Sequence, residues 1–153
     1  MKKGKLLIVD DEIDLLKSIK ILLEDLADSI ELARDGQEAI EILSREEFQC
    51  VICDINMPRK NGVEVIAEMR RQGNNVPFIF YTAHGNRELM LEVVKYGPFD
   101  FLDKPNLDGL EEVVSRGLKH GLAQGQGVQK DQAVSEAEYL SEYHKLLNSL
   151  DEK

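Results

Sequence analysis

Short apolar runs alternate with amphipathic stretches five times along the chain. The apolar runs predict strands, which lie at 5–9, 29–33, 50–53, 77–81 and 99–102. The stretches between and after them carry apolar residues at helical spacing. They predict helices at 13–27, 37–44, from Asn61-Gly62 onward, 87–96 and 107–122.

Strict alternation of strands and helices predicts an α/β fold in which a parallel sheet is covered by helices on both faces. The strands are apolar runs rather than alternating patterns, as expected for strands buried on both sides. In the last helix, one apolar side is expected to face inward, with Leu107, Leu110, Val113 and Val114. Ligands of such sheets bind beyond the carboxyl ends of the strands, so the candidate chemistry is expected there.

The length of 153 residues predicts one domain with a short appendage. We expect the domain to span 1–123, a flexible linker to follow at 124–132, and an amphipathic helix at 133–153. The glycines between 117 and 127 indicate a fraying helix end that passes into this linker. The final segment is too short for an independent domain. It could fold back, pair with a second copy or lead into a further domain.

The charge excludes some classes of partner. The chain has 29 acidic residues against 19 Lys and Arg, a net charge of −10. Such a surface repels phosphate backbones and anionic lipids, so direct binding to nucleic acid or membranes is disfavoured. The longest aliphatic stretch, Leu6 to Val9, is too short to span a bilayer, and no secretory core follows the start. We therefore expect a cytoplasmic protein.

Cys50 and Cys53 form a C-x-x-C pattern inside a predicted buried strand. Residues three apart in a strand point to opposite faces, so the two sulfurs should diverge. A zinc site would also need two further ligands that the sequence does not offer. The pattern therefore indicates two free, buried thiols and no redox or zinc site.

The residues that follow the strands carry the candidate chemistry. Asp10-Asp11 follow the first strand, Asp54 the third, Thr82-Ala83 the fourth, and Lys104-Pro105 the fifth. Three carboxylates in one cleft repel one another, which would raise their pKa values unless a cation neutralises them. An oxygen-only cluster suits Mg²⁺. A carboxylate nucleophile, a divalent cation, a lysine and a hydroxyl are the parts needed for phosphoryl transfer to an aspartate.

Four motifs together resemble bacterial response-regulator receiver domains of two-component signalling. They are Ile8-Val9-Asp10-Asp11-Glu12, Cys53 to Pro58 with Asn61-Gly62, Tyr81-Thr82-Ala83, and Phe101 to Pro105. The resemblance extends from about Lys5 to Leu122, with every motif in the family's order. It implies a doubly wound (βα)5 flavodoxin-like fold. It also implies a switch that accepts a phosphoryl group from a histidine kinase or phosphotransfer protein. It implies no enzymatic activity beyond the chain's own phosphorylation and dephosphorylation.

The resemblance also implies residue roles. Asp54 would be the phosphoacceptor, and Mg²⁺ would be held by Asp11, Asp54 and the backbone carbonyl of Asn56, with Asp10 acting through a water. Lys104, with a cis peptide to Pro105, would contact a phosphoryl oxygen. The hydroxyl of Thr82 and the backbone N–H of Ala83 would bind the other oxygens. Phe101, where tyrosine is frequent in the family, would be the aromatic switch. Asn56 and His84 would tune the lifetime of the phosphate.

Three interpretations of the whole chain remain open. The leading one is a signalling switch whose fourth helix, fifth strand and fifth helix bind a protein partner or a second copy. The wide apolar surface of the fourth helix, with Leu89, Met90, Val93, Val94 and Tyr96, favours this output. The chain could instead be the receiver segment of a longer regulator or hybrid histidine kinase. An aspartyl-phosphate phosphatase is the third possibility. Such enzymes use a second aspartate as general acid, at the position where this chain has Asn56.

Overall fold

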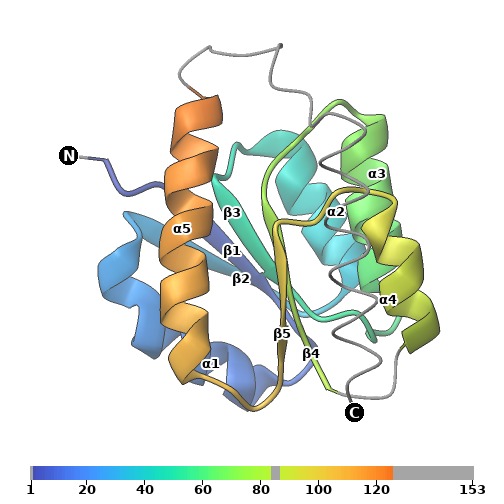
Figure 1. Ribbon diagram of the computed structural model, residues 1–153, viewed down its shortest axis with the longest axis horizontal. Helices are drawn as coiled ribbons and strands as arrows, with labels where there is room; N and C mark the ends of the chain where they lie inside the picture. Colours follow the sequence, from blue (N-terminus) through green and yellow to red (C-terminus); the bar gives the residue numbers. More distant parts are fainter. Residues whose placement is uncertain (1, 84–86, 126–153) are drawn as a thin grey trace.

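Five parallel strands form one sheet at the centre of the molecule (Figure 1). The computed structural model describes residues 2–83 and 87–125. The strands are β1 (Lys5–Val9), β2 (Ser29–Ala33), β3 (Cys50–Cys53), β4 (Phe78–Thr82) and β5 (Asp100–Asp103). They lie in the order β2-β1-β3-β4-β5, so the strand order reverses between β1 and β3. The predicted doubly wound flavodoxin-like fold is confirmed.

Helices cover both faces of the sheet (Figure 1). They are α1 (Ile13–Leu23), α2 (Gly36–Arg45), α3 (Gly62–Arg71), α4 (Arg87–Val94) and α5 (Asp108–Gln124), with a 3₁₀ turn η1 (Glu24–Leu26) after α1. On one face Leu6, Ile8 and Ile52 of the sheet pack with apolar residues of α1 and α5. On the other, Leu7, Val51 and Phe80 pack with residues of α2, α3 and α4. Each face of the sheet therefore has its own hydrophobic core.

The predicted boundaries are confirmed for β1, β2 and β3 and differ at some other ends. The helix expected to reach residue 27 stops at Leu23 and tightens into η1. The strand expected from Pro77 begins at Phe78, because proline has no N–H to donate to a neighbouring strand. The carbonyl of Pro77 still accepts a hydrogen bond from the backbone N–H of Val51 at 2.9 Å.

Full burial of the strands is confirmed for β3 and β4 but not for the edges of the sheet. The outer strands β2 and β5 are largely half-buried. An edge strand has a neighbour on one side alone, and its covering helices extend past it less completely. The apolar pattern of β5 therefore leaves a half-buried surface beside α4 and α5.

Two expectations for the last helix are wrong. Leu107 does not face inward; it precedes the first turn of α5 and is 36% exposed. Gly117 and Gly121 do not mark a fraying end, since both are buried in a helix that continues to Gln124. A Cβ at Gly121 would lie 1.9 Å from the backbone oxygen of Gln49. The glycines therefore allow α5 to approach the sheet closely, and the helix predicted at 133–153 lies outside the described residues.

The two cysteines lie in β3 and are both free and buried. Cys50 belongs to the core beneath α1 and α5, and Cys53 to the core on the opposite face. Burial raises the pKa of the Cys50 thiol to about 12 and that of Cys53 well above its ordinary value. The prediction of diverging structural thiols is confirmed. Separately, none of the helices within the described residues is long and apolar enough to cross a membrane.

Candidate functional site

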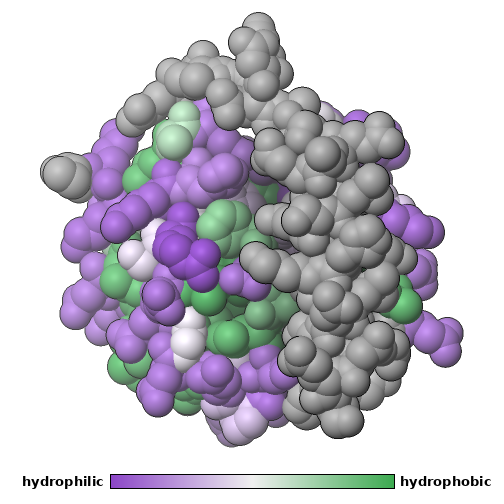
Figure 2. Space-filling model, viewed as in Figure 1, coloured by the Kyte–Doolittle hydropathy of each residue, from purple (hydrophilic) through white to green (hydrophobic). Residues whose placement is uncertain are grey.

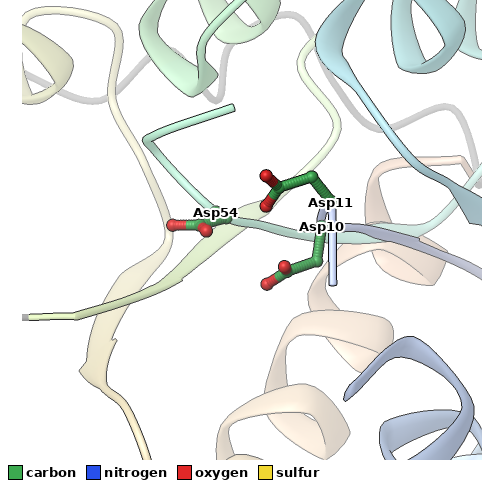
Figure 3. A group of neighbouring side chains, drawn as sticks. All are labelled: Asp10, Asp11 and Asp54. Carbon is green, nitrogen blue, oxygen red and sulfur yellow. The ribbon is translucent and has the colours of Figure 1, made fainter. Parts of the chain in front are cut away.

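The carboxyl ends of β1 and β3 bring three aspartates together. Asp10 and Asp11 follow β1 and Asp54 follows β3, and Figure 3 shows their carboxylates pointing to the same side. One carboxylate oxygen of each lies within 4.8 Å of the others. Asp10 and Asp54 are buried, at 2% and 7% exposed, whereas Asp11 is exposed. The predicted acidic cluster is therefore formed.

Backbone hydrogen bonds hold the two buried carboxylates in place. The backbone N–H of Glu12 donates to Oδ1 of Asp10 at 3.0 Å, and that of Ile55 to Oδ1 of Asp54 at 2.7 Å. The N–H of Asp54 itself donates to the carbonyl of Val9 at 3.0 Å, which extends the pairing of β1 and β3. Because one oxygen of each carboxylate is engaged in this way, the second oxygen is left to face the cleft.

Lys104 follows the end of β5 and lies beside the acidic cluster. Its Nζ lies 2.8 Å from Oδ2 of Asp10, 3.1 Å from Oδ2 of Asp54 and 3.4 Å from Oε1 of Glu12. Burial disfavours the charged ammonium. The hydrogen bond to Asp10 and the charge of Asp54 outweigh that effect and raise the pKa of Lys104. The peptide to Pro105 is cis, as expected. The protonated form of Lys104 is therefore favoured between the two buried carboxylates.

The electrostatics of the cluster favour a bound cation. Burial raises the pKa of Asp10, and the hydrogen bond to Lys104 and that from Glu12 lower it without cancelling the effect. One lysine therefore does not fully compensate this buried carboxylate. Carboxylate oxygens are the ligands that hard divalent cations prefer. The donor set of Asp10, Asp11 and Asp54 thus fits Mg²⁺.

Thr82 supplies an unsatisfied hydroxyl. It is the last residue of β4 and is 2% exposed, yet its Oγ1 has no hydrogen-bond partner among the described residues. Buried polar atoms are almost always paired, and this hydroxyl has its donor available for a bound group. Ala83 follows and is exposed. The backbone carbonyl of Thr82 accepts a hydrogen bond from the N–H of Lys104 at 3.0 Å, which joins both residues at one edge.

Phe101 lies in β5, next to β4. Its ring stacks on Phe80, with centroids 5.7 Å apart, and it is half-buried. Asn56 is exposed in the loop after β3. His84 lies outside the described residues. The structure thus brings together Asp10, Asp11, Asp54, Thr82 and Lys104.

Two residues around the site had no functional role in the sequence interpretation. Glu12 is part of the first motif, but only the structure shows its carboxylate beside Lys104. Arg59 has φ of 71°, and its Nε lies 3.6 Å from Oδ2 of Asp35. A positive φ is rare for any residue except glycine, asparagine and aspartate. No sequence pattern therefore indicated the conformation of Arg59 in the loop that carries Asn56.

Solved structures share this architecture. A CheY-like response regulator receiver domain protein from Methanospirillum hungatei superposes with a TM-score of 0.73 at 25% identity, covering 83% of this chain and 100% of that one. The receiver domain of the Francisella response regulator 1452 gives a TM-score of 0.69 at 29% identity, covering 76% and 97%.

Curated relatives are longer than this chain. The transcriptional regulatory protein FixJ of Bradyrhizobium diazoefficiens is 29% identical over 134 residues, which cover 88% of this chain and 64% of FixJ. The response regulator protein PilR of Pseudomonas aeruginosa is 33% identical over 120 residues, which cover 78% of this chain and 27% of PilR. The family model of the response regulator receiver domain matches residues 6–115. The chain therefore belongs to the response regulator receiver domain family of two-component systems.

Proposed function

We propose that this chain is a phosphorylation-activated switch and that Asp54 accepts the phosphoryl group. The observation that carries the proposal is the placement of Asp54. Its carboxylate is oriented by the N–H of Ile55, lies 3.1 Å from Nζ of Lys104 and belongs to the acidic cluster with Asp10 and Asp11. A buried carboxylate next to cations is a competent nucleophile toward phosphorus.

In the proposed reaction, a carboxylate oxygen of Asp54 attacks the phosphorus of a phosphohistidine. The new O–P bond forms as the P–N bond breaks, and the electron pair of that bond returns to the imidazole nitrogen. With acetyl phosphate as donor, a P–O bond breaks and acetate leaves. Lys104 stabilises the negative charge on the transferred group, since its Nζ already contacts Asp54 and Asp10.

Asp10, Asp11 and Asp54 are the residues that would hold Mg²⁺, together with the backbone carbonyl of Asn56. When bound, the cation would neutralise charge on the carboxylates and on the phosphoryl oxygens. Support for this assignment comes from the oxygen-only donor set and from the raised pKa of Asp10, which burial causes. We further propose that Asn56 and His84 tune the lifetime of the phosphate.

Thr82 would respond to the bound phosphoryl group. Its hydroxyl, which is unpaired within residues 2–83 and 87–125, would donate to one phosphoryl oxygen and the N–H of Ala83 to another. Moving Thr82 toward the phosphoryl group would leave space for Phe101, whose ring already stacks on Phe80 in the neighbouring strand. Because phenylalanine has no hydroxyl, packing alone would distinguish the two positions of Phe101.

The test of the phosphoacceptor is incubation with acetyl phosphate and Mg²⁺, followed by intact mass measurement. The wild-type chain should gain one phosphoryl group, and Asp54→Asn should not. Asp108→Asn is the matched control, because it removes an exposed carboxylate at the start of α5 by the same substitution. An adduct that persists in Asp54→Asn would refute the assignment. Rapid turnover of unrelated phosphate esters would favour a phosphatase.

We propose that the output surface comprises α4, β5 and α5. In α4, Met90, Val93 and Val94 are buried, while Leu89 and Leu91 stay half-buried at the surface. Figure 2 shows apolar residues gathered beside α5 on the side of β5. This surface would bind a downstream protein or a second copy. Sedimentation with and without the phosphoryl analogue beryllium trifluoride would separate these two outcomes.

We propose that the chain acts within a two-component phosphorelay. The chain spans 64% of FixJ and 27% of PilR, so it could also be the receiver segment of a longer regulator or hybrid kinase. Its buried free thiols fit a reducing compartment, and we propose that it acts in the cytoplasm. The kinase or phosphotransfer protein that phosphorylates Asp54 can be identified by transfer of a labelled phosphoryl group in vitro.

A further inference from the structure

Glu12 occupies the N-cap position of α1 without capping the helix. Its backbone is extended, with φ of −90° and ψ of 103°, and its side chain makes no capping hydrogen bond. Serine, threonine, aspartate and asparagine are the residues that stabilise this position. The Glu12 carboxylate instead lies 3.4 Å from Nζ of Lys104. Formation of the helix therefore does not explain where this side chain lies.

Glu12 contacts two members of the site. Its backbone N–H donates to Oδ1 of Asp10 at 3.0 Å, and its side chain reaches Lys104. The side chain is 66% exposed, whereas the other carboxylates on Lys104 are 3% and 9% exposed. The backbone contact holds Glu12 at the solvent side of the site. Of the three carboxylates that contact Lys104, that of Glu12 therefore separates from it most easily.

We propose that Glu12 is a positioning residue that competes with the incoming phosphoryl group for Lys104 and thereby slows phosphorylation of Asp54. The inference rests on the function proposed for Asp54. Before phosphorylation, the single ammonium of Lys104 is shared by three carboxylates. A phosphoryl oxygen must take over part of this coordination, and the negative charge of Glu12 also opposes the approach of an anionic donor. Both effects act in the same direction.

The expected size follows from the exposure of the pair. Solvent-exposed ion pairs change an equilibrium by roughly 1.4- to 5-fold and are screened by salt. Removing the charge by Glu12→Gln should therefore accelerate phosphorylation of Asp54 by acetyl phosphate about two- to fivefold. The acceleration should shrink as the ionic strength rises. It should also shrink with phosphoramidate, which carries less negative charge than acetyl phosphate.

The matched control is Asp14→Asn. Asp14 is likewise acidic and exposed and lies in the first turn of α1, and within the described part of the chain it makes no contact with Lys104. The substitution changes the net charge by the same amount. Rates of adduct formation are measured by intact mass for the wild type and both variants. Glu12→Gln is also measured in a Lys104→Met background, where its accelerating effect should be smaller, because only the repulsion of the anionic donor is left.

Three outcomes would overturn the proposal: equal acceleration in Glu12→Gln and Asp14→Asn, a slower rate in Glu12→Gln, or an undiminished acceleration in the Lys104→Met background. Unfolding curves of all variants in urea show whether they are folded. Failure of the wild type to form any adduct with either donor would instead refute the function proposed for Asp54, and with it this inference.

Discussion

Replacing Thr82 by valine should preserve or raise stability while weakening the response to phosphate. Valine has the same branched shape, and Thr82 is 2% exposed with an Oγ1 that has no hydrogen-bond partner among the described residues. A buried polar group without a partner costs about 1–3 kcal/mol. Thr82→Val removes that cost and loses no hydrogen bond within the part of the chain that the structure describes. We therefore expect the free energy of unfolding to stay equal or rise by up to about 2 kcal/mol.

Thr82→Val should also bind a phosphoryl analogue more weakly than the wild type. If the Thr82 hydroxyl donates to a phosphoryl oxygen, it forms a hydrogen bond to a charged acceptor, worth about 1.5–3 kcal/mol. Thr82→Val should then bind beryllium trifluoride with Mg²⁺ about tenfold or more weakly. Urea denaturation in the presence of a chelator measures the first effect. Denaturation with increasing analogue measures the second, because ligand binding to the native state raises the unfolding free energy.

Tyr81→Phe is the matched control. Tyr81 is 1% exposed and its hydroxyl is also unpaired among the described residues, but its side chain belongs to the core beneath α1 and α5. It should match Thr82→Val in stability and bind the analogue like the wild type. Destabilisation of Thr82→Val by more than about 1 kcal/mol would show that the hydroxyl is paired before phosphorylation. Unchanged analogue binding would remove Thr82 from the site.

Three further predictions test features of the fold. Gly121→Ala should lower the unfolding free energy by about 3 kcal/mol or more, because the new Cβ would lie 1.9 Å from a backbone oxygen. In the same urea titration, Gly125→Ala should change it by less than about 0.5 kcal/mol, because its Cβ would lie 3.6 Å from the nearest atoms of the described residues outside its chain neighbours. Arg59→Gly should unfold at higher temperature than Arg59→Ala, since glycine relieves about 1 kcal/mol of strain at φ of 71°. Arg70→Lys should lower the unfolding free energy by about 2–3 kcal/mol, because the guanidinium donates to four backbone carbonyls, and amide hydrogen exchange after α4 should accelerate.

The positions of the strands and the members of the site could be predicted from the sequence. Strands buried on both faces must be apolar throughout, so runs such as Leu6 to Val9 and Cys50 to Cys53 stand out from amphipathic helices. Parallel strands also end at the same edge of the sheet. Residues that directly follow them, such as Asp54 and Lys104, therefore had to converge whatever the details of packing.

Distances and packing at single positions were decided by the tertiary structure. The sequence indicated that Gly121 lies in a fraying helix end, whereas the close approach of α5 to Gln49 makes glycine necessary within that helix. Leu107 fits the apolar period of α5, but it precedes the first turn and is exposed. Periodicity describes one element alone, and it does not report how far the neighbouring element extends.

The chemistry of the site was likewise determined in part by the sequence and in part by the tertiary structure. Which residue types meet at the strand ends was determined by the sequence, because order along the chain and parallel topology together specify it. The burial of the Thr82 hydroxyl, the sharing of Lys104 and the contact of Glu12 were decided by the folded chain alone. Hydrogen bonds and ion pairs depend on differences of a few tenths of an ångström between residues far apart in sequence, and no local pattern encodes those distances.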